Sequence, residues 1–497
     1  MSGDFPDKTY PTLTLNGRPK KGLPKYGKYD QTVAKKLLDI VGPDNYSDRP
    51  EELIAYSRDS TLFSYRPEAV VRPTTVEQVS AIMKLANEYM IPVTPRGGGT
   101  SASGSPLAVV GGIILDMSSM NKITSIDIDN QSVTVEAGVV CDNLNDELAK
   151  SSFFFPPDPA SSPACTIGGM VNTNAAGNRT IKYGSTKDWV LWIEIVLPSG
   201  EVINTGSKVL KSSSGFDLTR LMVGSEGQLG IATKVGLRVT PLPESYATAV
   251  LIFDNIRNLA AAATAIRRAG IVPEMIEFMN AKTAKASLDY AKIKGIPEGN
   301  FLLIDCGGAK ESVGPMLDKS LGLVQQYKPI FVDRAPDRAY RDRLVNARKA
   351  ALPALARLRP TTSMEDLTVL PTRLADAVEA VEKIPDRLGV EGMGLGNFGH
   401  VADGNMHPTF VYDERVKEQK EAFFKGMDIL YREIVFPMGG SCTGEHGIGL
   451  IRADYIELEY GKTAVGLMRS IKQLFDPNLI LNPGKGKGGP YPLERGE

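Results

Sequence analysis

Three histidines occur in the 497-residue chain, and their positions indicate a metal site and a base. Two of them bound the stretch His400-Val-Ala-Asp-Gly-Asn-Met-His407. Asp-Gly between short apolar runs is a strong signal for a two-residue β-hairpin turn. With Asp403 and Gly404 at the centre of the turn, His400 faces His407 across the hairpin, on the same face of both strands. Neutral imidazoles with Cβ atoms about 4.5–5.5 Å apart are able to share one cation.

The third histidine lies in the glycine-rich stretch Cys442-Thr-Gly-Glu-His-Gly-Ile-Gly449. Glu445 would complete a two-histidine, one-carboxylate metal site of the open, catalytic type, and the adjacent His446 would remain free as a base. Structural interpretations compete with both assignments. The paired histidines could be packed in a core, and the third could be a surface residue in a glycine-rich turn.

The residues upstream predict the elements that position a ligand. Ala69–Arg72 is predicted as a strand, and Thr75–Tyr89 as an amphipathic helix that a capping box opens at Thr74-Thr-Val-Glu77. A second strand, Pro92–Pro95, runs directly into the glycine-rich loop Arg96–Gly104. Consecutive backbone amides in such a loop form a concavity that binds anions.

Beyond Pro243 the chain repeats a strand–helix–strand order, which returns between Asp366 and Phe436. The strands lack the long apolar runs of a parallel sheet, so the pattern predicts an α+β domain of ferredoxin-like type with an antiparallel sheet. The predicted organisation is a basic, flexible arm at 1–30, a first domain at 31–243, a cap domain at 244–438, and a helical segment at 439–497 that packs back onto the first domain.

Gly394-Leu-Gly-Asn-Phe-Gly399 matches the dinucleotide fingerprint G-x-G-x-x-G, but its context argues against that function. The fingerprint requires a strand before it and a helix after it. Here His400 and the Asp403-Gly404 turn follow, so the sequence does not predict a Rossmann site for NAD.

The bulk composition excludes several classes of protein. The formal net charge is −1, which gives no overall attraction to nucleic acid, and no apolar run is long enough to span a bilayer. The start of the chain has no signal-peptide pattern, so a cytoplasmic location is expected, with peripheral association with a membrane as the alternative. The four cysteines form no CxxC pair, so they predict buried, reduced thiols and no iron–sulfur cluster: Cys141, Cys165, Cys306 and Cys442.

Eight motifs in order and spacing resemble the FAD-linked oxidases of the vanillyl-alcohol-oxidase fold, in the D-lactate, glycolate and D-2-hydroxyglutarate dehydrogenase branch. The resemblance covers about Asp48 to Lys485. The motifs are Pro95-Arg-Gly-Gly-Gly-Thr-Ser101, Phe155-Pro-Pro-Asp-Pro159, Thr166-Ile-Gly-Gly169, Lys182-Tyr-Gly184, Gly224-Ser-Glu-Gly-Gln-Leu-Gly230, the two-histidine hairpin, Gly444-Glu-His-Gly447 and Leu481-Asn-Pro-Gly-Lys485.

The resemblance implies FAD bound between two α+β subdomains, with the loop Arg96–Gly104 around the pyrophosphate. Some members of the fold attach FAD through a histidine in this loop. Thr100 occupies that position here and the first domain has no histidine, so a non-covalent FAD is expected. The residues that match flavin-contacting segments are Arg96, Gly97, Gly98, Gly99, Thr100, Ser101, Gly104, Asp158, Thr166, Gly168, Gly169, Gly177, Tyr183, Glu226, Gly227, Ile231 and Asn482.

The same resemblance implies that His400, His407 and Glu445 bind one divalent ion (zinc, manganese or iron) and that His446 is the base. Arg348 matches the arginine that clamps the substrate carboxylate. Between Arg334 and Arg359 the chain carries eight basic residues and two acidic ones. Such a run is also typical of a solvated helix face, so the role of Arg348 as the carboxylate clamp is inferred from the resemblance alone.

The expected activity is oxidation of a small D-2-hydroxy acid to the 2-oxo acid, with D-lactate first, and glycolate or D-2-hydroxyglutarate as alternatives. The electrons would pass to an external acceptor, for example an electron-transferring flavoprotein or an iron–sulfur subunit. The alternatives are a non-redox flavin transferase that resembles alkyl-glycerone-phosphate synthase, and a FAD subunit of a larger redox complex. A homodimer is compatible with the sequence.

Overall fold

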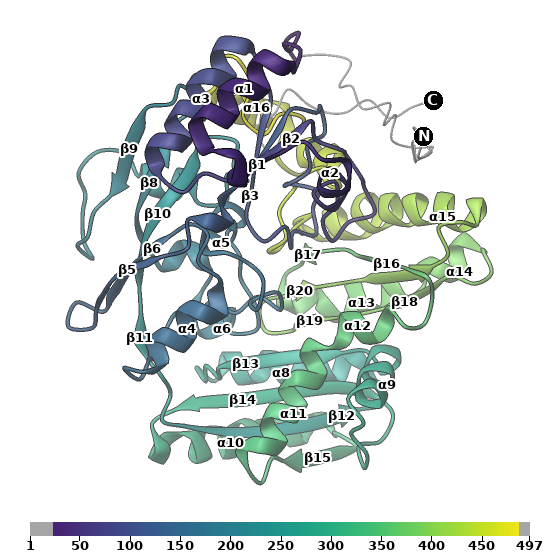
Figure 1. The fold of residues 1–497 in the computed structure, drawn as a ribbon. Helices are drawn as coiled ribbons and strands as arrows, with labels where there is room; N and C mark the ends of the chain where they lie inside the picture. Colours follow the sequence, from purple (N-terminus) through teal and green to yellow (C-terminus); the bar gives the residue numbers. More distant parts are fainter. Residues whose placement is uncertain (1–22, 487–497) are drawn as a thin grey trace. The chain divides into compact units, whose positions relative to one another are not determined.

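The computed structural model describes residues 23–486, and the chain divides into two compact units (Figure 1). Among the described residues, the first unit contains 23–176, Ser185–Leu242 and 445–486. The second unit contains Gly177–Gly184 and Pro243–Gly444. The last crossing from one unit to the other is therefore the peptide bond between Gly444 and Glu445.

A four-stranded sheet in the order β1-β2-β4-β3 forms one half of the first unit. β2 and β3 run parallel to β4, whereas β1 is antiparallel to β2. The apolar faces of α1 (Gln31–Val41) and α3 (Val76–Tyr89) pack with this sheet into one core, to which Val33, Leu37 and Met83 contribute. The elements are α1 (Gln31–Val41), β1 (Tyr46–Ser47), α2 (Pro50–Ala55), β2 (Ala69–Val71), α3 (Val76–Tyr89), β3 (Val93–Arg96) and β4 (Ile113–Asp116).

The helix α3 uses a capping residue one position later than the sequence predicts. Thr75, not Thr74, is the N-cap, and its hydroxyl accepts a hydrogen bond from Gln78 N at 3.3 Å. The Gln78 side chain reaches back to Thr74 N at 2.7 Å. Thr75 has the extended backbone that an N-cap requires (φ −139°, ψ 159°), so Gln78 takes the role predicted for Glu77.

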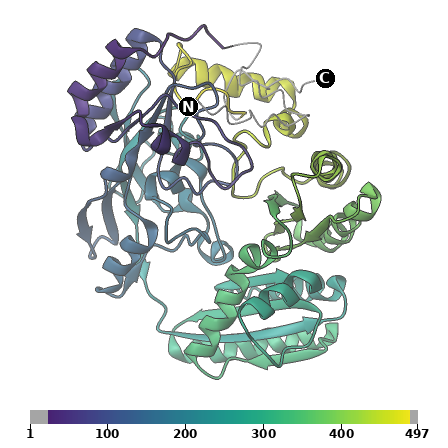
Figure 2. The same cartoon turned by 45° about the vertical axis from the view of Figure 1, so that its right-hand side comes forward.

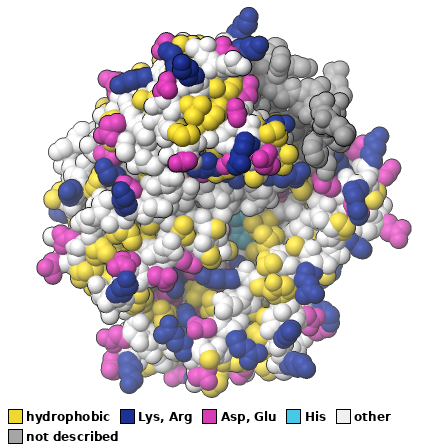
Figure 3. Space-filling model, viewed as in Figure 1, with side chains coloured by type: hydrophobic (Ala, Val, Ile, Leu, Met, Phe, Trp, Pro, Cys, Tyr) yellow, Lys and Arg dark blue, Asp and Glu magenta, His cyan; other side chains and the backbone are white. Residues whose placement is uncertain are grey.

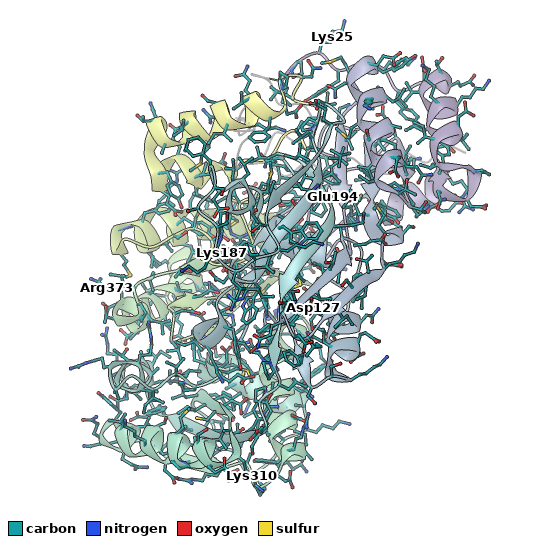
Figure 4. All side chains as sticks on the ribbon, turned by 90° about the vertical axis from the view of Figure 1, so that its left-hand side faces the viewer. Lys25, Asp127, Lys187, Glu194, Lys310 and Arg373 are labelled. Carbon is teal, nitrogen blue, oxygen red and sulfur yellow. The ribbon has the colours of Figure 1, made fainter. Side chains whose placement is uncertain are left out.

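A five-stranded antiparallel sheet in the order β5-β6-β10-β8-β9 forms the other half of the first unit. Glu194 of β8, labelled in Figure 4, accepts a hydrogen bond from the Thr233 hydroxyl at 2.9 Å and pairs with Lys234 at 3.3 Å. The elements are β5 (Ile123–Asp127), β6 (Ser132–Glu136), α4 (Cys141–Ala149), β7 (Phe153–Phe154), α5 (Ile167–Thr173), β8 (Val190–Val196), β9 (Val202–Gly206), α7 (Leu218–Met222), β10 (Ile231–Arg238) and β11 (Thr240–Pro241).

The C-terminal segment is joined to the first unit through buried polar contacts. Its helix α16 (Ile456–Phe475) is kinked at Gly461. Lys472 of this helix is buried and donates to Gln228 O and Leu481 O, each at 2.7 Å. Leu481 forms a parallel bridge with Val93 of β3. The segment therefore extends the four-stranded sheet.

The N-terminal arm predicted at 1–30 lies mostly outside the described residues, which begin at 23. Its last part contacts the first unit. The Tyr26 hydroxyl donates to Leu479 O at 2.6 Å, and Gly27 N donates to Met90 O at 2.8 Å.

The second unit is built on a seven-stranded antiparallel sheet in the order β15-β12-β14-β13-β19-β20-β17. Its centre is the pair β12 and β14, which are in register over nine residues from Ser245↔Gly308 to Phe253↔Asn300. The unit also contains a separate three-stranded sheet in the order β16-β21-β18. The strands are β12 (Ser245–Phe253), β13 (Met275–Met279), β14 (Asn300–Gly308), β15 (Phe331–Arg334), β16 (Thr361–Met364), β17 (Leu367–Thr368), β18 (Gly394–Gly396), β19 (Phe398–His400), β20 (Asn405–Met406) and β21 (Thr409–Tyr412).

Helices cover both faces of the seven-stranded sheet (Figure 2). On one face, Leu344 and Val345 of α11 pack with Met275, Met279 and Leu303 of the central strands. The α+β architecture with an antiparallel cap sheet confirms the predicted fold class. The helices are α6 (Thr180–Tyr183), α8 (Ile256–Arg268), α9 (Ala281–Tyr290), α10 (Lys310–Val324), α11 (Arg338–Lys349), α12 (Ala351–Leu355), α13 (Leu374–Glu382), α14 (Ile384–Leu388) and α15 (Lys417–Asp428).

The surface shows no large region of one charge on the face in Figure 3, where lysine and arginine alternate with acidic side chains. This agrees with the formal net charge of −1. Among residues 23–486, no helix combines the length and the apolar character that a membrane crossing requires.

Candidate active site

The histidine hairpin has a different register from the predicted one. His400 pairs with Asn405, and Gly399 pairs with Met406, so His400 is not directly opposite His407. Instead His407 N donates to Phe398 O at 2.7 Å. The register differs from the prediction by two residues, which is a full side-chain period, so both histidines remain on one face of the hairpin as diagonal neighbours.

The turn explains the change of register. Asp403 N and Gly404 N both donate to His400 O, at 3.3 and 3.1 Å, so four residues form the loop. A two-residue type I′ turn needs positive φ at both central positions. Only Gly404 has it here (φ 84°), because the Asp403 side chain accepts a hydrogen bond from Asn405 N at 3.1 Å and caps a wider turn.

The two hairpin histidines are buried and close enough to bind one ion. Their exposed fractions are 6% for His400 and 3% for His407, and their ring centroids lie 5.4 Å apart in an edge-to-face arrangement. Each ring has a buried carboxylate on its Nδ1 side: Glu277 Oε1 at 2.7 Å from His400, and Asp366 Oδ1 at 3.7 Å from His407. A carboxylate behind the ring favours the tautomer that leaves Nε2 as a ligand, and this arrangement is typical of metal-binding histidines.

Glu277 also contacts the predicted carboxylate clamp. Its second oxygen, Oε2, lies 2.7 Å from Arg348 Nη2. Arg348 is 4% exposed, and its guanidinium lies over the Phe398 ring, 4.9 Å from the centroid. The structure therefore brings Arg348 and His400 together through one carboxylate, although they are 52 positions apart in the printed numbering.

The Arg348 guanidinium is paired in charge but not in hydrogen bonds. Its Nε and Nη2 atoms are buried and make no aligned hydrogen bond within residues 23–486, in spite of the short distance to Glu277. Buried donors are normally satisfied, so unused N–H groups on a buried guanidinium indicate a place for an anionic ligand.

Asp366 fixes the chain just before the predicted third ligand. It accepts hydrogen bonds from the Thr443 hydroxyl at 2.6 Å and from Gly444 N at 2.8 Å. It also binds the Asn405 side chain of the hairpin at 2.7 Å. One buried carboxylate thus ties the histidine hairpin to the residue that precedes Glu445.

Glu445 and His446 open the returning segment of the first unit. Their side chains are partly buried, and His446 Nε2 lies 3.7 Å from Glu445 Oε1. The turn after them is held by Glu226, which accepts from Ile448 N at 2.7 Å and from Gly449 N at 2.9 Å. Gly447 has a positive φ of 86°, and a Cβ there would collide with the Glu226 carboxylate, so glycine is required.

The glycine-rich loop fits the predicted role in binding a pyrophosphate. Within the described part of the chain, the backbone amides from Gly97 to Ser101 donate to no protein acceptor. The glycines are also needed for packing, because a Cβ at Gly97 would collide with the Thr166 hydroxyl. Arg96 Nη2 donates to Arg58 O at 2.9 Å, and burial lowers the pKa of Arg96. A loop of unused amides beside a partly buried guanidinium suits a diphosphate group.

Several predicted flavin contacts gather around this loop in the first unit. Asn482 donates to Ser105 O at 3.1 Å and to Glu226 O at 2.7 Å, and Gly227 N donates to the Asn172 side chain at 3.0 Å. Glu226 itself is occupied by the turn amides described above. The remaining predicted residues of this unit are Gly98, Gly99, Thr100, Gly104, Asp158, Gly168, Gly169 and Ile231, and Ile231 belongs to the apolar core.

Two predicted flavin residues, Gly177 and Tyr183, belong to the second unit. Their segment is attached there through Glu274, which is 3.1 Å from Arg179 Nε and accepts from the Tyr183 hydroxyl at 3.4 Å. Burial raises the pKa of Glu274, and the adjacent Arg179 opposes the rise. Burial likewise raises the pKa of Tyr183.

The sequence analysis missed Glu277 and Asp366. Glu277 interrupts an apolar strand, Met275-Ile-Glu-Phe-Met279, and a charged residue in such a strand was an available signal. Asp366 lies just before β17 with no comparable pattern around it. The rejected fingerprint at Gly394–Gly399 forms the strands β18 and β19 with no helix after them, which confirms that rejection.

Two family models match the chain. Residues 67–206 match a model described as "FAD binding domain", and residues 242–486 match "FAD linked oxidases, C-terminal domain". Together they include the glycine-rich loop, the hairpin and the returning segment.

Curated relatives match over nearly the whole chain. The glycolate oxidase subunit GlcD of Bacillus subtilis is 37% identical over 91% of this chain and 96% of its own length. A D-lactate dehydrogenase of Anaerostipes hadrus is 33% identical over 92% and 96%. The mitochondrial D-lactate dehydrogenase [cytochrome] of Arabidopsis thaliana is 31% identical over 95% and 83%.

Solved structures share the fold at low identity. p-Cresol methylhydroxylase with bound substrate superposes with a TM-score of 0.78 at 20% identity, over 94% of this chain and 99% of that one. An alkyldihydroxyacetonephosphate synthase gives a TM-score of 0.71 at 20% identity, over 95% and 88%. These structures confirm the vanillyl-alcohol-oxidase type of FAD-binding fold. The chain belongs to the FAD-linked oxidase family, in the branch that contains glycolate oxidase subunits and D-lactate dehydrogenases.

Proposed function

We propose that this FAD-linked oxidoreductase oxidises a small D-2-hydroxy acid to the corresponding 2-oxo acid and requires a divalent metal ion. The observation that carries the proposal is the buried Arg348 guanidinium with two N–H groups that lack an aligned acceptor. A planar guanidinium binds a carboxylate through two parallel hydrogen bonds, so an α-carboxylate matches its unused donors.

The relatives narrow the substrate class. They are named as glycolate oxidase subunits and D-lactate dehydrogenases, and both names specify short 2-hydroxy acids. D-lactate is the first candidate here. Glycolate and D-2-hydroxyglutarate are the alternatives, and they differ only in the group at C2.

His400, His407 and Glu445 are the proposed metal ligands. Two buried imidazoles supported by Glu277 and Asp366 supply nitrogen donors, and Glu445 supplies an oxygen donor one residue after the clamped Gly444. Such a mixed set suits zinc, manganese or iron and leaves positions open for a substrate. A divalent ion held by these residues would lower the pKa of the substrate's 2-hydroxyl group.

The side chains have separate roles in the proposed reaction. Arg348 holds the carboxylate, and the Phe398 ring beneath the guanidinium keeps that charge in a water-poor environment. His446 accepts the proton of the 2-hydroxyl as a general base. FAD held by the first unit would supply the two-electron oxidant, and the α-hydrogen of the substrate leaves as hydride. The substrate thus loses one proton and one hydride and becomes the 2-oxo acid.

Reoxidation needs a second partner. The four cysteines are buried and form no CxxC pair; Cys141 and Cys165 contact each other, but they are only two of the four thiolates that an iron–sulfur cluster requires. We propose an external acceptor; the candidates are an electron-transferring flavoprotein, an iron–sulfur subunit, a quinone or cytochrome, and oxygen.

A substrate panel with an artificial dye acceptor tests the proposed function. The purified enzyme should reduce the dye with D-lactate and more slowly, or not at all, with L-lactate and with 3-hydroxybutyrate. Higher rates with glycolate or D-2-hydroxyglutarate would identify that acid, rather than D-lactate, as the preferred substrate within the same class. No dye reduction with any 2-hydroxy acid would refute the proposal.

A further inference from the structure

Glu277 is the charged residue of an otherwise apolar strand in the centre of the second unit. It lies in β13, and its side chain is 1% exposed. Its face of the sheet packs against α11, where Met275, Met279 and Leu344 form the surrounding core. A carboxylate in such a core is unfavourable unless several donors or charges compensate it. The burial of Glu277 is therefore explained by its two partners, which compensate its charge.

The partners come from two other elements. His400 of β19 is 2.7 Å from Oε1, and Arg348 of α11 is 2.7 Å from Oε2. One rigid carboxylate group thus connects the proposed metal ligand with the proposed carboxylate clamp. Phe398 also contacts both groups: its ring lies under the Arg348 guanidinium and 5.5 Å from the ring centroid of His407, the second proposed ligand.

We propose that Glu277 is a positioning residue that sets the spacing between the metal ion and Arg348, and thereby selects acids with the hydroxyl on the carbon next to the carboxylate. The inference rests on the proposed function. Glu277 Oε1 accepts a hydrogen bond from Nδ1–H of His400, and in that tautomer Nε2 of the ring is the metal-binding nitrogen. Its other oxygen, Oε2, lies 2.7 Å from Arg348 Nη2 and positions the guanidinium by charge, without an aligned hydrogen bond. The two attachment points of the substrate are then fixed relative to each other by one side chain.

The chain contains a matched control for this arrangement. Asp305, on the neighbouring strand β14, is also fully buried and binds Arg341 of α11 through Nε at 3.1 Å and Nη2 at 2.5 Å. Arg341 precedes Arg348 by seven residues, or about two helical turns. Asp305 therefore shares the burial, the sheet and the partner helix of Glu277, but its side chain binds Thr248 and Arg341 rather than a histidine.

The experiment compares Glu277→Gln, Glu277→Leu and Asp305→Asn with the parent enzyme in the FAD-bound form. The readouts are the affinity for Zn²⁺ or Mn²⁺, and KM and kcat at saturating metal. We expect both Glu277 variants to bind metal about 10- to 100-fold more weakly and to raise KM for D-lactate. The leucine variant should lose more than glutamine, which still accepts one hydrogen bond. Asp305→Asn should lower the melting temperature but keep metal affinity and KM.

A spectroscopic readout separates this inference from the proposed function. The three histidines give three sets of ring signals in ¹⁵N-histidine NMR. In metal-free protein at mildly alkaline pH, His400 should carry its proton on Nδ1 in the parent and lose this preference in Glu277→Leu. An unchanged tautomer, or parental metal affinity and KM in folded Glu277 variants, would overturn the inference. A parent enzyme that binds no metal but shows the tautomer change would refute the proposed function instead.

Discussion

Arg341 and Arg348 lie two turns apart on α11 and are both buried, but only Arg341 is bound through aligned hydrogen bonds to its carboxylate partner. Burial alone would lower the pKa of Arg341, but the bonds to Asp305 raise it above its ordinary value. Arg341 is thus fully used by the fold. Arg348 has buried donors without an aligned acceptor, and this difference favours Arg348 over Arg341 as the proposed carboxylate clamp.

Arg348→Lys should therefore raise KM for the hydroxy acid about 10- to 100-fold and leave the FAD content unchanged. Lysine keeps the positive charge but cannot make two parallel hydrogen bonds, each of which contributes about 1.5–3 kcal/mol when charge-assisted. Steady-state kinetics over a range of D-lactate concentrations measure the effect. Arg341→Lys is the control and should affect thermal stability rather than KM. Parental KM in Arg348→Lys would move the carboxylate site elsewhere.

The FAD should be released by acid. Thr100 has no nucleophilic nitrogen for a flavin link, and all three histidines lie outside the glycine-rich loop. Precipitation in trichloroacetic acid should leave the yellow colour in the supernatant and a colourless pellet. Flavin fluorescence that stays with the chain in a denaturing gel would show a covalent bond and contradict this expectation.

His446→Ala should reduce kcat by about 10²- to 10⁴-fold, the usual cost of losing a general base. The imidazole lies outside the proposed ligand set, so the variant should retain its metal ion and its FAD. Elemental analysis and the flavin absorbance verify both. His407→Ala should behave differently, with loss of the metal. A His446 variant that loses metal to the same extent would make His446 a ligand rather than a base.

Lys485 should make stability depend on pH above neutrality. It is fully buried, with its ammonium group 2.6 Å from Leu107 O, and burial lowers its pKa to about 7. In the unfolded chain a lysine titrates at about 10.4. Between these values the unfolded chain binds more protons, so the contribution of Lys485 to the free energy of unfolding increases with pH, by up to about 1.4 kcal/mol per unit.

Denaturant unfolding at pH 7, 8 and 9 tests this dependence. Lys485→Met should give a smaller increase in the free energy of unfolding over this range than the parent protein. Lys187→Met, which changes an exposed lysine, should keep the parental dependence. The same pH dependence in the parent and in Lys485→Met would show that Lys485 does not titrate in this window.

The sequence predicted the elements better than the contacts between them. The hairpin at Asp403-Gly404 was recognisable from local turn chemistry, but its register depends on whether Asp403 adopts a positive φ or caps a wider turn with its side chain. The sequence pattern does not distinguish these two turn conformations. His400 and His407 nevertheless lie on the same face, as predicted, because the observed pairing register differs from the predicted one by two residues, a whole side-chain period.

The support of the site could not be predicted in the same way. Glu277 contacts residues that are 71 and 123 positions away in the chain, and Asp366 contacts residues 39 to 78 positions away. Such contacts depend on how β13, β19 and α11 pack in three dimensions. No local period or turn signal encodes them, whereas the two histidines proposed as ligands stand out because the chain has only three histidines.

In the proposed mechanism, a hydroxy acid reduces the flavin only when the histidine hairpin holds a metal ion. Anaerobic mixing of D-lactate with metal-replete and with metal-free protein, followed by the visible absorbance of FAD, measures this dependence. We expect rapid bleaching in the replete enzyme, none in the metal-free enzyme although FAD stays bound, and recovery when zinc, manganese or iron is added. Equal bleaching in verified metal-free protein would refute the proposed role of the metal.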